Sequence, residues 1–248
     1  MPVPDQSVYR RPLPDTCVNF SSDEGDRLFI NALQKGYARV YMKLIGSVVA
    51  NDEPEHCGVK SFEAILNAFG IMEAKKDWDA PWKWSSETLV DCCTPLSNVK
   101  WTGMSLEQFN ELGDRFNVKI TYGDDSEDFL KTLREAVIGT VRSKNKVLVA
   151  HYDRTILGQT GSSHFSPLAA YDPDTDQVLV NDVAYYIYPS HWVKMEQLCG
   201  AMLKIDKTTN KSRGFAQIEL KNEVGPMNVN VSNGKDSDTD QTGECDHI

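Results

Sequence analysis

The sequence predicts an α+β fold in which a helical half precedes a half built from an antiparallel sheet, with a cleft between the two. Two observations predict this arrangement. Apolar residues recur at helical spacing from residue 23 to residue 69, and the pattern changes to strand-like runs after residue 147. Helices and strands do not alternate as they do around a parallel sheet. With 248 residues and 40% hydrophobic content, the chain is long enough for one sizeable core or two small ones.

Charge and cysteine usage exclude several functional classes. The chain carries 36 acidic and 26 basic side chains and has no run of Lys and Arg, so no nucleic-acid partner is expected. No apolar stretch reaches the roughly 18 residues of a membrane span, and the sequence does not begin with a basic segment followed by an apolar one. Neither membrane insertion nor secretion is therefore expected. The six cysteines are scattered without a CxxC pair, which favours reduced thiols and a cytoplasmic location.

Three helices are predicted in the first part of the chain, after an extended, proline-rich arm over residues 1–20. Ser21 and Glu24 have capping-box spacing at the start of the first helix. Cys57 begins the third helix, which Gly70 ends. The three predicted helices span residues 23–35, 40–48 and 57–69.

The rest of the chain is predicted to mix helices with strands. A Trp-rich loop near residues 78–84 precedes helices over 87–93, 105–116 and 126–141 and a strand over 118–122. Further strands are predicted over 147–152, 165–171 and 177–183, followed by a short helix after Trp192 and a strand over 214–220. Turn-forming residues 172–176 predict a hairpin. Residues 1–220 are expected to form one domain, and residues 221–248 a disordered acidic tail.

Cys57 is the best candidate for a nucleophile. Unpaired backbone N–H groups at a helix N-terminus, together with the helix dipole, favour the thiolate, which is the nucleophilic form of cysteine. The alternative interpretation is a small apolar side chain in the core, because free cysteines are among the most buried residues. Position alone does not decide between the two, since a nucleophilic cysteine also needs a base.

His164 and Asp182 are the candidates for the groups that such a cysteine needs. His164 opens a predicted strand after the flexible sequence Gly161-Ser162-Ser163, which places an imidazole at a sheet edge facing the cleft. Asp182 lies on the adjoining strand of the hairpin, where a cross-strand contact would let it fix the tautomer of His164. A structural role is the alternative for either residue alone. The order Cys, His, Asp on a helix and two strands favours nucleophilic catalysis.

Several motifs of this sequence resemble the phytochelatin synthase family. The longer ones are Glu53-Pro54-Glu55-His56-Cys57-Gly58, Gln159-Thr160-Gly161-Ser162-Ser163-His164-Phe165-Ser166-Pro167, Asp182-Val183-Ala184 and Tyr188-Pro189-Ser190-His191-Trp192-Val193. The shorter ones are Tyr9-Arg10-Arg11-Pro12-Leu13-Pro14, Glu24-Gly25, Pro81-Trp82-Lys83-Trp84 and Asp91-Cys92-Cys93. The resemblance covers about residues 8–204, with the motifs in the family's order.

The resemblance implies a papain-like cysteine peptidase fold with the active site in the cleft. It implies that Cys57 is the nucleophile, His164 the base and Asp182 the residue that orients the base. The implied enzyme is a cytosolic acyltransferase that cleaves glycine from glutathione through a Cys57 thioester. It then transfers γ-Glu-Cys to glutathione or to a phytochelatin, and so contributes to heavy-metal detoxification. Pairing with a histidine implies a charged nucleophile at neutral pH.

Soft metal ions and thiol peptides are the implied partners. The family is metal-dependent, and Cd²⁺ or Zn²⁺ is expected to act as a thiolate complex of the substrate, with no organic cofactor. The vicinal Cys92 and Cys93 match the family and are weak metal-ligand candidates, with structural burial as the alternative. Glutathione, phytochelatins and soft metal ions are thus the expected partners, and a homodimer stays open.

Three positions bear on substrate binding. Asn51 stands where the family has a glutamine that completes the oxyanion hole, and it offers the same amide donor on a shorter stem. Glu53 matches the family and is expected to bind the α-amino group of the γ-glutamyl moiety. Tyr185 replaces an arginine associated with a substrate carboxylate, so it brings a hydrogen bond without a charge.

Two alternative functions stay open beside the transferase. The first is a hydrolase that releases glycine from glutathione or its S-conjugates with little transfer, which the residues at positions 51 and 185 favour. The second is a non-catalytic relative that binds thiols or metal.

Overall fold

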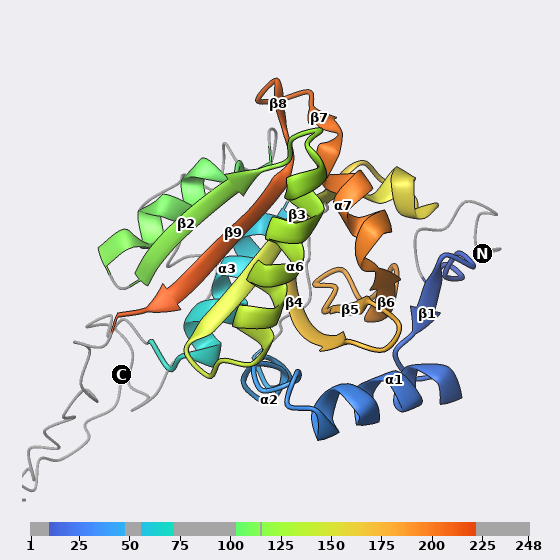
Figure 1. Cartoon of the computed structure of the whole chain (residues 1–248). Helices are drawn as coiled ribbons and strands as arrows, with labels where there is room; N and C mark the ends of the chain where they lie inside the picture. Colours follow the sequence, from blue (N-terminus) through green and yellow to red (C-terminus); the bar gives the residue numbers. More distant parts are fainter. Residues whose placement is uncertain (1–9, 48–55, 72–102, 115, 222–248) are drawn as a thin grey trace, which may run out of the picture.

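The computed structural model describes residues 10–47, 56–71, 103–114 and 116–221 (Figure 1). Its centre is a seven-stranded antiparallel sheet with the strand order β1-β6-β5-β4-β3-β9-β2. These strands are β1 (Cys17–Asn19), β2 (Phe116–Tyr122), β3 (Lys146–Asp153), β4 (Ser163–Asp172), β5 (Gln177–Val180), β6 (His191–Lys194) and β9 (Gly214–Leu220). A separate short hairpin pairs β7 (Ile205–Asp206) with β8 (Lys211–Ser212).

Helices cover the central strands of the sheet from both sides. In Figure 1, α6 lies in front of β3 and β4, and α3 lies behind them. Residues 164–172 of β4 are all buried, as expected for a strand with both faces covered. The helices are α1 (Asp23–Gln34), α2 (Tyr41–Leu44), α3 (Cys57–Ala68), α6 (Glu127–Val141) and α7 (Met195–Leu203), with 3₁₀ segments η2 (Glu107–Asp114) and η3 (Arg154–Leu157).

The sequence explains where the helices begin and what they bury. Ser22 caps α1, because its hydroxyl accepts the Gly25 backbone N–H at 3.1 Å. The capping-box spacing had indicated Ser21, one residue earlier. On α6, one stripe of fully buried side chains faces β3 and β4 and accounts for the docking of this helix. The stripe consists of Leu133, Val137 and Val141.

Several sequence-based predictions are confirmed. The hairpin at residues 172–176 forms, with Asp172 opposite Gln177 and its carboxylate accepting the Thr175 N–H at 3.0 Å. The predicted helix up to residue 141 is α6, and the predicted strand over residues 214–220 is β9.

Other elements differ from the prediction. The helix predicted over 40–48 is only the four residues Tyr41–Leu44 and ends before Gly46. The segment predicted as an α-helix over 105–116 forms η2, and the Ser105 N–H is bonded to the Gln108 side chain at 2.7 Å. The strand predicted over 177–183 ends at Val180. Strands β1 and β6 were missed, because runs of three and four residues are too short to show a period.

The α+β prediction is confirmed, because the helices and the antiparallel sheet pack around a shared core. Residues 10 and 11 of the predicted arm donate backbone hydrogen bonds to the carbonyls of residues 186 and 187, and β1 pairs with β6. No helix within the described ranges is long and apolar enough to cross a membrane. The Trp-rich loop, the helix predicted over 87–93 and the tail after residue 221 lie outside the described residues.

Candidate active site

The N-terminus of α3 meets the first residues of β4 at the centre of the molecule. Cys57 is the first residue of α3, as predicted, and its sulfur accepts the backbone N–H of Phe165 at 3.4 Å. The N–H of Gly58 also faces this sulfur. His164 precedes Phe165 on β4 and is buried, as is Cys57. The packing of α3 against β4 therefore brings together two residues that lie far apart in the sequence.

Asp182 completes the cluster. Its Oδ1 lies 2.9 Å from His164 Nε2 and accepts the backbone N–H of Ala184 at 2.9 Å. Because β5 ends at Val180, Asp182 does not lie on the hairpin strand, as the sequence had indicated. It lies just beyond the strand, where the Ala184 N–H holds its carboxylate in an Asx-type turn. His164 thus contacts Asp182, and Cys57 contacts the backbone of the residue after His164, although the cross-strand placement of Asp182 was wrong.

Arg154 is the site residue that the sequence-based analysis missed. Its Nη2 donates to both Asp182 oxygens, at 2.9 and 2.7 Å, and lies 2.8 Å from His164 Nε2. The signal that could have found it is the β3–β4 pairing, which places Asp153 opposite Ser163. A residue that follows β3 must therefore lie beside the start of β4, where His164 sits.

Burial and this arginine set the charges of the cluster. Burial acts to raise the pKa of Asp182, but the Arg154 and His164 charges outweigh it and hold that pKa far below its usual value. Burial acts to lower the pKa of Arg154, and the Asp182 carboxylate more than compensates and raises it. Burial and the Arg154 charge together lower the pKa of His164 to about 4. At neutral pH the cluster therefore holds a carboxylate, a guanidinium and a neutral imidazole.

Cys57 is a neutral thiol in this state. Burial raises the pKa of Cys57 to about 11, and the Phe165 N–H offsets only part of the rise. The expectation that the Cys57 sulfur is charged at neutral pH is thus wrong. The physical reason is that the sulfur takes its hydrogen bonds from backbone N–H groups in a dry environment, whereas His164 is neutral and directed to Asp182.

The His164 ring faces competing neighbours. Arginine only donates hydrogen bonds and a carboxylate only accepts them, yet both lie within 2.9 Å of His164 Nε2. A proton on Nε2 would be donated to Asp182 and would leave Nδ1 as the basic nitrogen. A bare Nε2 would instead accept from Arg154 and would place the proton on Nδ1. Only the first tautomer has a basic nitrogen free to take a proton from a thiol.

The remaining candidates are placed as follows. Tyr185 is 50% exposed, three residues after the buried Asp182. Asn51, Glu53, Cys92 and Cys93 lie outside the described residues. The Ser163 hydroxyl lies 2.6 Å from His151 Nε2.

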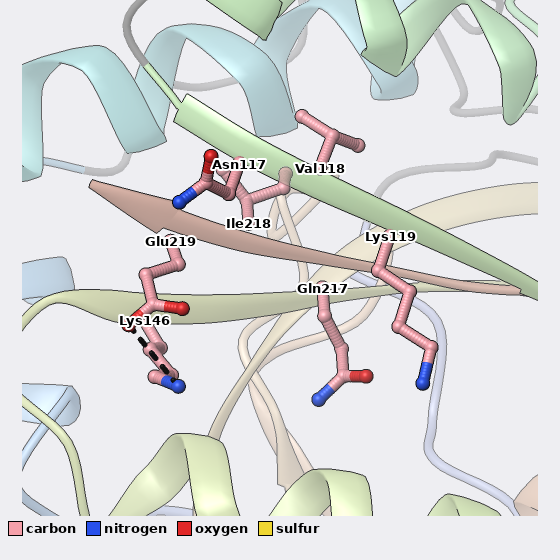
Figure 2. A pocket seen from close by; sticks show the side chains of 7 residues that line it. All are labelled: Asn117, Val118, Lys119, Lys146, Gln217, Ile218 and Glu219. Carbon is pink, nitrogen blue, oxygen red and sulfur yellow. Dashed lines mark ion pairs between the residues drawn. The ribbon is translucent and has the colours of Figure 1, made fainter. Parts of the chain in front are cut away.

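A pocket of about 200 Å³ lies elsewhere, on the sheet face formed by β2, β9 and β3 (Figure 2). Its rim carries an ion pair between Lys146 and Glu219, with 3.2 Å between nitrogen and oxygen. Its lining contains no cysteine, histidine or aspartate, so this pocket offers none of the chemistry gathered around Cys57.

Comparison with known proteins assigns this chain to a family. The sequence model of one family, described as phytochelatin synthase, matches residues 8–215. The chain belongs to the phytochelatin synthase family. The match includes the whole Cys57, His164 and Asp182 cluster, and the resemblance seen in the sequence motifs is confirmed.

Curated relatives in this family are named glutathione gamma-glutamylcysteinyltransferase. The Arabidopsis thaliana protein 1 of this name is 38% identical over 213 residues, covering 86% of this chain and 44% of the relative. The Schizosaccharomyces pombe protein is 31% identical over 214 residues, 86% of this chain and 51% of the relative. The Triticum aestivum protein 1 is 34% identical over 232 residues, 93% of this chain and 46% of the relative. The chain therefore spans about half the length of these relatives.

Proposed function

We propose that this phytochelatin synthase family member is a γ-glutamylcysteinyl transpeptidase that uses glutathione as donor. The observation that carries the proposal is that His164 contacts Asp182 while the Cys57 sulfur contacts the backbone N–H of Phe165, the next residue of β4. The names of the curated relatives supply the substrate class. We further propose that residues 1–220 form one catalytic domain with a papain-like arrangement, in which a helix-borne cysteine faces a histidine on the sheet.

In the first half-reaction, the Cys57 sulfur attacks the carbonyl carbon of the Cys-Gly bond of glutathione. Its proton passes to His164 Nδ1, the nitrogen left free when Nε2 donates to Asp182. The imidazolium then gives this proton to the nitrogen of the departing glycine as the C–N bond breaks. A γ-glutamylcysteinyl thioester remains on Cys57. Asn51 is proposed to donate its amide to the oxyanion, and Glu53 to bind the α-amino group of the donor.

In the second half-reaction, the amino group of another glutathione or of a phytochelatin attacks the thioester carbonyl. His164 takes a proton from the attacking amine as the new amide forms, and it gives this proton to the Cys57 sulfur as the C–S bond breaks. We propose that Cd²⁺ or Zn²⁺ enters as a thiolate complex of the acceptor, since soft ions prefer sulfur ligands. The same proposal includes a direct role of Cys92 and Cys93 in holding such an ion. It also includes a homodimer and a cytoplasmic location.

The resting thiol fits a mechanism in which the proton transfer accompanies attack. Burial disfavours both the Cys57 thiolate and the His164 imidazolium, so the two residues are more stable as a neutral pair in this dry site. Substrate polar groups that enter the site reduce this penalty at the moment of reaction. Catalysis is therefore expected to depend on His164 more strongly than it would for a pre-formed thiolate.

Mass spectrometry of the products tests the function. The purified chain is incubated with millimolar glutathione, with and without Cd²⁺, beside a Cys57→Ala control. Peptides of the form (γ-Glu-Cys)n-Gly that disappear in the control support the transpeptidase. Absence of both glycine release and longer peptides in the wild-type chain contradicts it, and would leave the thiol- or metal-binding alternative.

A hydrolase is the second candidate, and Tyr185 is the observation that favours it. The side chain is half exposed just after the catalytic carboxylate, and it offers no positive charge to an acceptor carboxylate. Weak acceptor binding leaves the thioester to water. The variant Tyr185→Arg should raise the ratio of lengthened peptide to free glycine, with Tyr185→Phe as the uncharged control. An unchanged ratio in Tyr185→Arg rules out this explanation.

A further inference from the structure

Buried polar side chains behind Asp182 form a hydrogen-bonded chain that the proposed mechanism does not use. Arg154 Nη1 donates to Gln159 Oε1, and Gln159 Nε2 lies 2.8 Å from His191 Nε2. His191 Nδ1 lies 2.8 Å from the carbonyl oxygen of Pro189. The Arg154, Gln159 and His191 side chains are all buried, and His191 is fully so. The chain therefore links the start of β6 to the guanidinium that contacts Asp182.

The donors and acceptors at its two ends fix every proton in this chain. Arg154 only donates, so the Gln159 amide must turn its oxygen to Arg154 and its nitrogen to His191. The Pro189 carbonyl only accepts, so His191 must carry its proton on Nδ1. His191 Nε2 is then bare and accepts from Gln159. Burial lowers the pKa of His191, which favours this neutral form.

We propose that His191 and Gln159 are positioning residues that hold the Arg154 guanidinium on the Asp182 carboxylate, beside His164. The role of these two residues in catalysis rests on the proposed function, whereas their hydrogen bonds to Arg154 and to each other do not. His191 orients the Gln159 amide, and that amide gives Arg154 a second acceptor besides Asp182. The chain thus defines where the guanidinium sits relative to His164 Nε2.

The expected consequence follows from the charges that face each group. Asp182 and Arg154 act on both His164 and His191, and the Arg154 charge opposes protonation of His164. A guanidinium that is no longer held at Asp182 opposes it less, so His164 should titrate at higher pH. His191 also acts directly on His164 and lowers its pKa, so the deciding variant is Gln159→Leu, which keeps His191. If these side chains only fill the core, this variant leaves the His164 titration unchanged.

NMR titration of protein labelled with ¹⁵N-histidine tests the proposal without any substrate. The wild-type spectrum should show His191 with a protonated Nδ1 and a bare Nε2. The His164 signals are assigned by their loss in His164→Asn. In His191→Phe and in Gln159→Leu the His164 titration should move up by about one pH unit. His191→Gln, whose side-chain oxygen can accept from Gln159, should restore the wild-type value.

The matched control is Cys17→Ala. The Cys17 sulfur is the other contact of Gln159 Nε2, at 3.7 Å, and its removal leaves the links to His191 and Arg154 in place. This variant should leave the His164 titration unchanged. A protonated Nε2 on His191 in the wild-type protein, or an unshifted His164 in His191→Phe, overturns the proposal.

A same-size variant covers the case in which His191→Phe does not fold. In Gln159→Glu the carboxylate still accepts a hydrogen bond from Arg154. Its other oxygen also only accepts, so it can bond to His191 Nε2 only when that nitrogen carries a proton. His191 should then show both nitrogens protonated at neutral pH, and a neutral His191 in this variant overturns the proposal. Glycine release that depends on Cys57 is measured separately. Absence of this release contradicts the proposed function, whereas the histidine titrations alone test the hydrogen-bonded side chains.

Discussion

The Phe165 backbone N–H points at the Cys57 sulfur, with 3.4 Å between nitrogen and sulfur. Phe165 follows His164 directly, so one short stretch of β4 carries both the proposed base and a hydrogen-bond donor to the proposed nucleophile. The Phe165 ring stacks on His151, with ring centroids 4.1 Å apart, which fixes this stretch against β3. The position of α3 relative to β4 therefore decides the geometry of the whole cluster.

Gly58 tests that dependence. A Cβ at this position would lie 2.7 Å from the Met104 Cβ, so either the first turn of α3 or the segment that carries Met104 must shift. Gly58→Ala should cost about 1–3 kcal/mol of stability, as for other overpacked cores, and should lower Cys57-dependent glycine release. Met104→Gly in the same chain removes the clashing atom and should restore part of the activity. Undiminished activity in Gly58→Ala alone would show that the α3 position tolerates this shift. Urea unfolding and product analysis are the measurements.

Cys57 should react slowly with iodoacetamide in the absence of substrate. Its pKa is raised to about 11 by burial, so the thiolate fraction should rise about tenfold per pH unit between neutral pH and pH 10. Peptide mass spectrometry identifies the modified residue, and Cys57→Ser is the control. A reaction rate that is already constant from pH 6 upward would show a pre-formed thiolate and contradict this expectation.

Arg154 should stabilise the folded protein as well as the cluster. Arg154→Met leaves the buried Asp182 carboxylate without its main partner, and removal of one member of a buried ion pair costs about 3–5 kcal/mol. The double variant Arg154→Met, Asp182→Asn removes both charges and should recover much of this loss. Urea unfolding at pH 7 measures both changes. Equal stability of the wild-type chain and Arg154→Met would contradict the buried-pair interpretation.

Stability should fall as the pH is lowered below about 6.5, the usual histidine pKa. Burial lowers the pKa of His164 to about 4 and that of His151 to about 3, so both stay neutral in the folded state while they become protonated in the unfolded state. The unfolded state then binds more protons, and the free energy of unfolding decreases towards low pH. Between pH 6 and pH 4 each histidine contributes about 1.4 kcal/mol per pH unit.

The check is the free energy of unfolding in urea at pH 7 and at pH 5. His151→Phe should reduce the difference between the two values, because it removes one of the titrating groups while keeping a ring against Phe165. An equal or larger difference in this variant would assign the acid sensitivity to other groups.

The sequence was informative where a local signal exists. The helix that starts at Cys57, the hairpin at residues 172–176 and β9 each follow from periodicity or turn residues, and the structure confirms them. The contact between His164 and Asp182 was expected as a cross-strand pair, and the contact exists although Asp182 lies beyond the end of β5. These features depend on residues that are near in sequence or on adjacent strands.

The missed features depend on tertiary contacts. Arg154 is an arginine after a strand, and nothing local shows that its side chain is buried against Asp182. The neutral state of Cys57 follows from desolvation by α3, β4 and their neighbours, which a helix-terminus argument does not include. Strand β1 exists because β6 lies beside it, since three residues hold no period of their own.

That pairing of β1 with β6 has a consequence for synthesis on the ribosome. Cys17 is made before its partner Val193, so β1 cannot join the sheet until the residues of β6 have left the ribosome. The thiol of Cys57 is likewise made long before His164 and Asp182. A nascent chain therefore carries Cys57 before residues 164 and 182 exist, so the cluster around the sulfur can assemble only after both have been made.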